Sequence, residues 1–387
     1  MKILSYAPRA STAVFLPTEI VIQIVSAVAE DDDLDGRQET LYSCCLVSRQ
    51  WYSAAVPFLY ERPRLDKGRS FEKFTRVICP PVGAPKSKAN LGSFVRRLNM
   101  SGLVHHSSNS LTARLLGRVK ENLEVFIAPA ASFSINCLAS LSKCGNLRYL
   151  DLSLVNESIP FTSLKKAISH LQKLVTLRLP RSTILTDPER LQWPPKLQRL
   201  QVGGTFKDNM HSFLWPEQIT RMSLKNCTDL SVGAMRALVT NPHLGRNLRR
   251  LTVSTFNRGL QMESISIIPT YLTNLVFLSV PGDLIFDDFF ETLRVVHGQR
   301  KPLPLEVLEF AFSHTGDALE FEWQSLIDTL DNALANLRAV GVHDMFIKDL
   351  WPCEVEDALA ERAEKQDLPV SKDTEEYEVG VYCIYDN

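Results

Sequence analysis

The side chains in this sequence that are best suited to chemistry are basic residues that recur at regular spacing among short apolar segments. The most regular of them are Arg178, Arg199, Arg221, Lys225 and Arg250. Arg97 stands in a comparable position in an earlier segment. A planar guanidinium can donate two parallel hydrogen bonds to one carboxylate or phosphate, so arginines aligned on one surface suit such groups. The pattern predicts a surface that binds anions and does not predict one that makes or breaks bonds.

No other group of residues predicts catalysis. The sequence contains no glycine-rich phosphate loop, no GxSxG turn and no HExxH pair. His105 and His106 have no cysteine nearby, and none of the eight cysteines forms a CxxC pair. We therefore expect a non-enzymatic protein without metal or cofactor, whose cysteines are reduced intracellular thiols.

The longest apolar stretch, residues 20–29, is too short to cross a bilayer. The sequence also lacks the charged and then apolar layout of a signal peptide at its start. We expect the protein in the cytoplasm, the nucleus or both, with no membrane partner.

The basic residues belong to ten leucine-rich segments of the form LxxLxL within residues 95–350. The segments start at Val95, Leu123, Leu147, Leu174, Leu197, Ile219, Leu248, Leu275, Leu305 and Leu337. Their mean spacing of about 27 residues lies in the range of leucine-rich repeats. Each start alternates like a short strand, and helical spacing follows many of them. We expect an α/β fold, a leucine-rich-repeat horseshoe with parallel strands on its concave face and helices outside.

Side chains alternate across a strand, so the third and fifth residues of each segment should face the concave surface. Because neighbouring parallel strands lie about 4.8 Å apart, the arginines are expected to form a basic ladder along this surface. We predict that it binds an acidic or phosphorylated segment of a protein client. Nucleic acid ranks lower as a partner, because only Tyr149 and Phe277 add aromatic rings to these positions.

Charge is distributed unevenly along the chain, although the net charge is only −1. Residues 1–94 carry a balance of +2, residues 95–260 of +14 and residues 261–387 of −17. A basic first half of the array would serve an acidic client. The alternative is that both halves are solvated and partly compensate each other across the horseshoe.

Both ends of the array have features of a cap, which the terminal units of a solenoid need. Residues 354–368 predict an amphipathic helix, and the alternation from Tyr377 to Tyr385 predicts a closing strand. Residues 62–77 predict a partial strand and a helix. A small polar side chain should turn inward at the ninth position of five repeats, at Ser182, Thr205, Cys227, Asp283 and Ser313.

Residues 16–62 predict three short helices with more apolar surface than so small a unit can bury. Pro17 can begin a helix without losing a hydrogen bond. In the first helix, one apolar stripe is expected from Ile20, Ile24 and Val28, extended by Val21 and Val25. An acidic turn at 30–36 precedes a second helix from about Gln38 and a third from Ser48.

These helices closely resemble an F-box, in the form found in filamentous fungi. The resemblance lies in Leu16-Pro17, Glu19-Ile20, Leu46-Val47-Ser48-Arg49, Trp51 and Val56-Pro57-Phe58-Leu59-Tyr60-Glu61. The acidic gap between the first two helices is longer than in the common pattern. In that family the helices dock on the Skp adaptor, which links them to a cullin and its RING subunit. The resemblance therefore implies a non-catalytic substrate receptor of an SCF-type ubiquitin ligase.

By this resemblance, the residues expected to bind the Skp adaptor are Leu16, Pro17, Ile20, Ile24, Leu46, Val47 and Trp51. Two alternatives stay open. The protein could be a leucine-rich interaction scaffold that binds Skp or another partner without promoting ubiquitin transfer, or the three helices could simply cap the repeats. The predicted division of the chain is a tail (1–15), the F-box (16–62), a connecting segment (63–94), the repeat array (95–350) and a C-terminal cap with an acidic tail (351–387).

Overall fold

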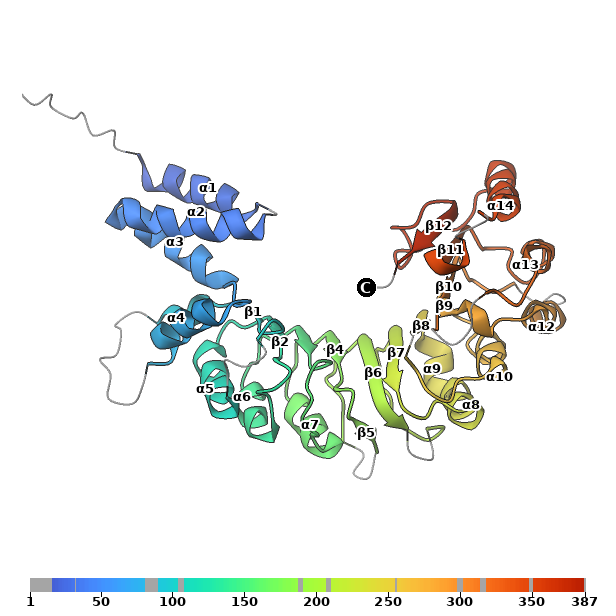
Figure 1. Ribbon diagram of the computed structural model, residues 1–387, viewed down its shortest axis with the longest axis horizontal. Coiled ribbons are helices and arrows are strands. Elements are labelled where there is room, and N and C mark those ends of the chain that lie inside the picture. Colours follow the sequence, from blue (N-terminus) through green and yellow to red (C-terminus); the bar gives the residue numbers. More distant parts are fainter. Residues whose placement is uncertain are drawn as a thin grey trace, which may run out of the picture.

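The computed structural model shows three helices at one end of a curved solenoid of parallel strands (Figure 1). It describes residues 16–385, except residues 32 and 255 and segments 81–89, 104–107, 187–190, 207–209, 298–301, 314–317 and 348–350. The predicted tail 1–15 and the pair His105 and His106 lie outside the described residues.

The N-terminal unit consists of α1 (Thr18–Ala29), α2 (Leu34–Val47) and α3 (Arg49–Glu61). The prediction that the second helix starts near Gln38 is wrong. The Asp33 carboxylate accepts a hydrogen bond from the Gly36 N–H at 3.2 Å and caps the helix earlier. The acidic gap is correspondingly shorter than the sequence suggests.

A small core holds the three helices together. Its buried residues are Val21, Val25, Leu41, Cys44, Ala54 and Ala55. The Gln50 side chain donates to the Leu16 carbonyl at 2.9 Å and so ties α3 to the start of α1. The Glu61 carbonyl at the end of α3 accepts a hydrogen bond from the Arg96 N–H at 3.0 Å. This contact links the helical unit to the start of the solenoid.

The solenoid is one parallel sheet, and its strands pair in chain order from one end to the other. They are β1 (Arg97–Asn99), β2 (Val125–Ile127), β3 (Tyr149–Asp151), β4 (Thr176–Arg178), β6 (Arg199–Phe206), β7 (Arg221–Cys227), β8 (Arg250–Val253), β9 (Phe277–Pro281), β10 (Val307–Ala311), β11 (Ala339–His343) and β12 (Gly380–Ile384). The short β5 (Ile184–Leu185) pairs with β6 alone. Strands β1–β4 and β6–β11 each begin two residues after a predicted repeat start, so the predicted array is confirmed.

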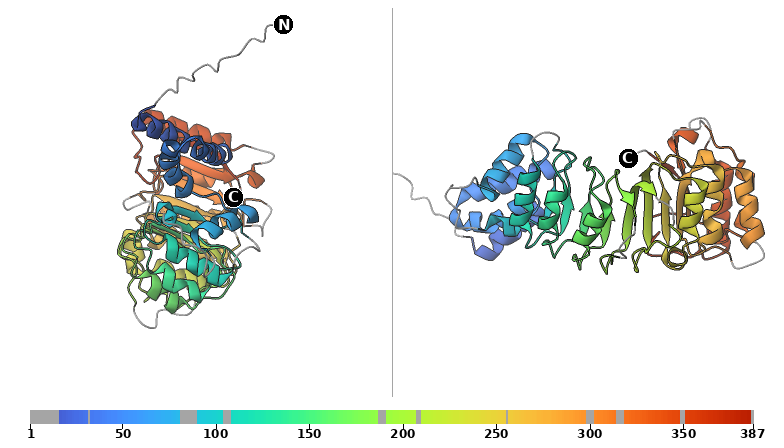
Figure 2. Two further views of the ribbon diagram at one scale, coloured as in Figure 1. Left: turned by 90° about the vertical axis from the view of Figure 1, so that its left-hand side faces the viewer. Right: turned by 90° about the horizontal axis from the view of Figure 1, so that it is seen from below.

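Helices line the outside of the curve, as Figure 1 shows, and Figure 2 shows the strands side by side along its length. The α-helices are α4 (Gly68–Ile78), α5 (Asn109–Val119), α6 (Leu138–Leu141), α7 (Phe161–Ile168), α8 (Val232–Val239), α9 (Pro242–Asn247), α10 (Met262–Ser266), α11 (Ile268–Tyr271), α12 (Asp287–His297), α13 (Trp323–Leu330) and α14 (Cys353–Lys365). Single 3₁₀ turns are η1 (Leu91–Phe94), η2 (Ile135–Cys137), η3 (Gly282–Leu284) and η4 (Asp344–Phe346).

The core lies between the strands and these helices. The second residue of each repeat strand points into it and is at most 3% exposed: Leu98, Phe126, Leu150, Leu177, Leu200, Met222, Leu251, Leu278, Leu308 and Val340. Because side chains alternate, the first and third residues of each strand face the concave side. The solenoid therefore presents two rows of side chains along its inner surface.

Of the five predicted ninth-position residues, Cys227 and Asp283 are buried as predicted, whereas Ser182, Thr205 and Ser313 are only half-buried. The Asp283 carboxylate is buried and accepts from the Ser313 N–H at 3.1 Å. The backbone N–H of the buried Cys227 donates to Asn257 Oδ1 in the next repeat at 2.8 Å. The Thr205 hydroxyl on β6 shares a hydrogen bond of 2.8 Å with the hydroxyl of Thr228, which directly follows β7.

The predicted caps are present in the structure. Helix α14 covers the last full repeat, and β12 adds to β11 in parallel register. At the other end α4 forms as predicted, but residues 62–67 form no strand in this described segment. Residues 366–379, which connect α14 to β12, cross to the concave side, and we call them the strap.

Candidate functional site

The first candidate surface is an uncovered apolar face on the three-helix unit. Four of its residues are well exposed: Ile20 (41%), Ile24 (39%), Leu46 (70%) and Val47 (63%). Pro17 is exposed beside them, whereas Leu16 and Trp51 are half-buried and pack against the small core. Apolar side chains of this size normally lie inside a protein or in an interface. The face therefore suits a partner with a complementary apolar groove.

The structure corrects the prediction that Val21 and Val25 extend one apolar stripe formed by Ile20, Ile24 and Val28. Both are fully buried, whereas Ile20 and Ile24 point to solvent. Successive helical residues differ by about 100° around the axis, so the core takes one stripe of α1 and leaves the adjacent stripe open.

Sequence reasoning missed three further exposed apolar residues of this unit, Ile22, Tyr42 and Tyr52. Tyr42 is 58% exposed and precedes Leu46 by one helical turn on α2. The spacing of four residues was the signal that could have found it.

The second candidate surface is a row of arginines on the concave side. Arg199, Arg221 and Arg250 are direct register partners on β6, β7 and β8. We call these three residues the arginine row. The predicted ladder is therefore present across three adjacent strands, with guanidinium groups on neighbouring strands.

Two other predicted basic residues lie outside the arginine row. Arg178 is in register with Gln201, not with Arg199, and its Nη1 lies 3.1 Å from Asp151 Oδ2. Its guanidinium also lies 5.7 Å from the Tyr149 ring. Lys225 is on β7 but four residues beyond Arg221, or about 13 Å along the strand.

Arg97 aligns with the arginine row but is separated from it by the β2, β3 and β4 strands. It lines a cleft of about 330 Å³ between the helical unit and the first repeat. Arg37, Arg62 and Arg64 line the same cleft. The predicted ladder is therefore not continuous up to β1.

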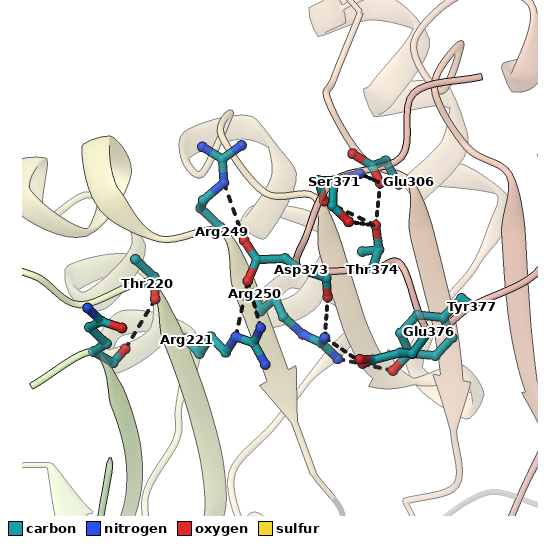
Figure 3. Close-up of polar contacts among 11 residues, drawn as sticks. Thr220, Arg221, Arg249, Arg250, Glu306, Ser371, Asp373, Thr374, Glu376 and Tyr377 are labelled. Atoms are coloured by element: carbon teal, nitrogen blue, oxygen red, sulfur yellow. Dashed lines mark hydrogen bonds and ion pairs between the residues drawn. The ribbon is translucent and has the colours of Figure 1, made fainter. Parts of the chain in front are cut away.

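The strap occupies two members of the arginine row (Figure 3). Arg221 donates to Asp373 Oδ1 from Nε at 3.2 Å and from Nη2 at 2.8 Å. The other oxygen of Asp373 lies 3.7 Å from Arg249 Nε. Arg250 Nη1 donates to Glu376 Oε1 at 2.9 Å. An acidic segment of the chain itself therefore lies where an acidic client was predicted.

Arg250 is the most enclosed cation of the site. Its guanidinium lies 4.0 Å from the Phe277 ring, and its Nη2 donates to the Tyr377 hydroxyl at 3.0 Å. Its burial disfavours the charged form, but the contacts with Glu376 and Tyr377 outweigh it and raise the pKa of Arg250. The charge is therefore held firmly in place.

Arg199 differs from its two neighbours, because no ion pair joins it to a carboxylate within the described residues. Partial burial, followed by the nearby charges of Arg221 and Arg250, lowers its pKa. An anion bound beside Arg199 would offset this repulsion.

The strap is anchored by a buried polar cluster. Thr374 is fully buried, and its hydroxyl donates to Glu306, which also accepts from the Ser371 N–H at 2.9 Å. Arg338 donates to the Thr374 and Tyr377 carbonyls and lies 3.9 Å from Glu306. These contacts hold the middle of the strap, while Asp373 and Glu376 reach toward the arginine row.

These contacts bear on the two explanations given for the uneven charge of the array, an acidic client or compensation between its basic and acidic halves. The alternative, that the basic and acidic halves of the array compensate each other, holds for Arg221, Arg249 and Arg250. Their carboxylate partners come from the acidic C-terminal region.

Glu309 on β10 is a half-buried carboxylate of the concave surface. It accepts from the Tyr382 hydroxyl at 2.8 Å, and Gly341 permits this approach, since a Cβ there would lie 2.8 Å from the Glu309 side chain. Burial raises the pKa of Glu309, and hydrogen bonds from Tyr382 and Ser279 oppose this shift only in part.

We predict that Glu309→Gln stabilises the protein at neutral pH. A carboxyl whose pKa is raised by folding favours the native state at low pH, and this contribution is lost as the pH rises through the folded value. Glutamine keeps an acceptor for Tyr382 without the charge. Urea unfolding at about pH 7.5 should show a higher free energy of unfolding for the variant, with the difference shrinking toward about pH 4. A variant less stable than wild type at neutral pH would contradict the assignment.

The described residues offer no support for other chemistry. No three His, Cys, Asp or Glu side chains among them are placed to hold a metal ion. All eight cysteines are free thiols, and burial raises the pKa of Cys144 and Cys227 to about 12. No helix in this part of the chain has the length and apolar character needed to span a bilayer.

A helical unit with an open apolar face, joined to a curved leucine-rich solenoid with a charged inner surface, places the fold in the leucine-rich-repeat class. The helical unit is also similar in sequence to a known domain, since residues 14–66 match the family described as F-box-like. The chain therefore carries an F-box-like domain followed by a leucine-rich-repeat solenoid.

Fungal F-box proteins are among its relatives. It is 33% identical over 240 residues to F-box protein YDR306C of Saccharomyces cerevisiae, an alignment that covers 62% of this chain and 48% of that protein. It is 25% identical over 248 residues to protein pof5 of Schizosaccharomyces pombe, with 64% and 68% covered. The aligned region thus spans about half the length of the first relative.

An internalin from Listeria monocytogenes aligns over 73% of this chain and 84% of its own, with a TM-score of 0.36 and 14% sequence identity. This likeness is too loose to define the fold, which is established by the strand pairing itself.

Proposed function

We propose that this protein is the client-recognition subunit of an SCF-type ubiquitin ligase. Its three-helix unit docks on a Skp-type adaptor, which connects it to a cullin and a RING subunit, and the concave face of the solenoid binds a protein client. Proteins with an F-box typically act in such ligases, and the chain itself contributes binding surfaces, not a catalytic site.

The observation that carries the proposal is the open apolar face of the F-box. The core of the unit is already closed by Val21, Val25 and their neighbours, so Ile20, Ile24, Leu46 and Val47 are not needed inside it. Burial of one such side chain in a partner's groove contributes about 1.5–3 kcal/mol. Four together support a stable interface.

Affinity purification of the full-length chain from a fungal extract tests the proposal. We expect a Skp-type adaptor and a cullin to co-purify in stoichiometric amounts. The adaptor without the cullin would instead support an interaction scaffold that does not promote ubiquitin transfer. If neither protein is recovered, the proposed function is wrong.

A further inference from the structure

We propose that the concave face recognises protein segments with two carboxylates three residues apart followed by an aromatic residue, and that the strap is the chain's own copy of such a segment. The inference rests on the proposed function, because it names the class of client that this face binds. The strap supplies the pattern with Asp373, Glu376 and Tyr377.

Each element of this pattern meets a separate part of the inner surface. Asp373 Oδ1 accepts from both Nε and Nη2 of Arg221, and its other oxygen lies beside Arg249, so one carboxylate meets two guanidinium groups. Glu376 takes Arg250, at 2.9 Å. The Tyr377 ring packs against Phe277 with a centroid distance of 5.6 Å. The inner surface therefore recognises the spacing of the two carboxylates, their charge and the aromatic residue, whereas a general basic patch would recognise charge alone.

The recognising side chains of the strap can exchange with those of a client without unfolding the cap. The Glu376 side chain is 57% exposed and that of Asp373 is 22% exposed, whereas Thr374 between them is fully buried. The strap is thus fixed at Thr374, and its two carboxylates lie at the solvent edge. A client that presents its own carboxylates to Arg221 and Arg250 restores both ion pairs, so the exchange leaves neither cation unpaired.

Arg199 gives a client an advantage over the strap. It continues the arginine row beyond Arg221, and the strap does not form an ion pair with it in the described structure. A client with a further carboxylate before the pattern would reach Arg199 and relieve the repulsion within the row.

The strap should compete with any client segment because it is tethered beside its site. Tethering of this kind gives an effective concentration on the order of millimolar. A free peptide with an intrinsic dissociation constant on the order of 100 µM would then bind the intact chain roughly tenfold more weakly than a chain whose strap cannot compete.

The test uses a synthetic peptide with blocked ends and the sequence of residues 371–379, SKDTEEYEV. Its affinity is measured by calorimetry for the full-length wild type and for Asp373→Asn with Glu376→Gln. We expect the double variant to bind at least tenfold more tightly than wild type. The single variant Glu376→Gln covers the case in which the double variant loosens the cap. It removes the more exposed carboxylate and leaves Asp373 and the Thr374 anchor in place, and it should show a smaller gain in affinity in the same direction.

The matched control is Glu375→Gln with Glu378→Gln. It removes the same number of charges from exposed strap positions that make no ion pair with an arginine in the described structure. This control should bind the peptide like wild type. Equal gains in both double variants would show a general charge effect and overturn the inference.

Specificity is tested in the Asp373→Asn, Glu376→Gln background. Adding Arg250→Glu should abolish peptide binding, whereas Arg97→Glu, far along the sheet, should not change it. Binding that persists without Arg250 overturns the inference, and so does a single-stranded oligonucleotide that binds as tightly as the peptide. Absence of peptide binding in every variant also overturns it, while co-purification with the Skp-type adaptor would remain as a separate result.

Discussion

A chain in which Leu46 and Val47 are both changed to serine is expected to lose at least a hundredfold in affinity for a Skp-type adaptor while keeping its fold. The two side chains are 70% and 63% exposed, so their loss removes little from the protein's own core. In an interface, each contributes about 1.5 kcal/mol or more by burial, and a tenfold change in affinity corresponds to about 1.4 kcal/mol. The measurement is the dissociation constant of the purified adaptor for each full-length chain.

The matched control is Val295→Ser on α12. Val295 is 80% exposed and lies on a helix of the solenoid, far from the F-box. This variant should bind the adaptor like wild type. An unchanged affinity after loss of Leu46 and Val47 would show that the open face of α2 is not the docking surface.

The second large effect is expected at the anchor of the strap. Glu306→Ala should lower the free energy of unfolding of the C-terminal cap by about 3–5 kcal/mol, because it leaves the buried Arg338 without a counter-charge. It also removes the acceptor for Ser371 and Thr374. Urea unfolding and hydrogen exchange of β11 and β12 should both report the loss, since a solenoid can open locally at its end.

Two further variants test whether loss of the Glu306–Arg338 ion pair causes the lower stability of Glu306→Ala. Glu375→Ala, at an exposed position of the strap, should change stability by no more than about 0.5 kcal/mol. Replacing Glu306 and Arg338 together with leucine and methionine should cost less than Glu306→Ala, because no buried charge is then left unpaired. If the double variant is the less stable of the two, the ion pair is not the source of the stabilisation.

The positions of the repeats could be predicted from the sequence because they depend on local patterns. Each strand needs an apolar second residue that points into the core, and this residue recurs at a fixed distance from each leucine-rich start. The apolar start at Leu197, for example, predicts β6 from Arg199, where it is found.

The candidate sites were predicted less completely, for reasons that can be traced to single residues. The single apolar stripe predicted on α1 is in fact two, because sequence spacing does not tell which of two adjacent stripes, that of Ile20 or that of Val21, the core will take. Arg178 was assigned to the ladder, yet it is the third residue of its strand, whereas Arg199 is the first, so it lies in the other row, beside Asp151. This difference is visible in the sequence, because Arg178 is the fifth residue of its repeat and Arg199 the third.

The sequence by itself determined the class of this protein: a three-helix F-box with surplus apolar residues, followed by leucine-rich repeats that place arginines on adjacent strands. Those features depend on spacing within short segments. Only the tertiary structure decided which of these arginines remain open to a client. Asp373 and Arg221 are 152 residues apart in the chain, and no local pattern links them. They meet because the solenoid curves and its C-terminal strap returns across the concave face, where opposite charges attract over short distances.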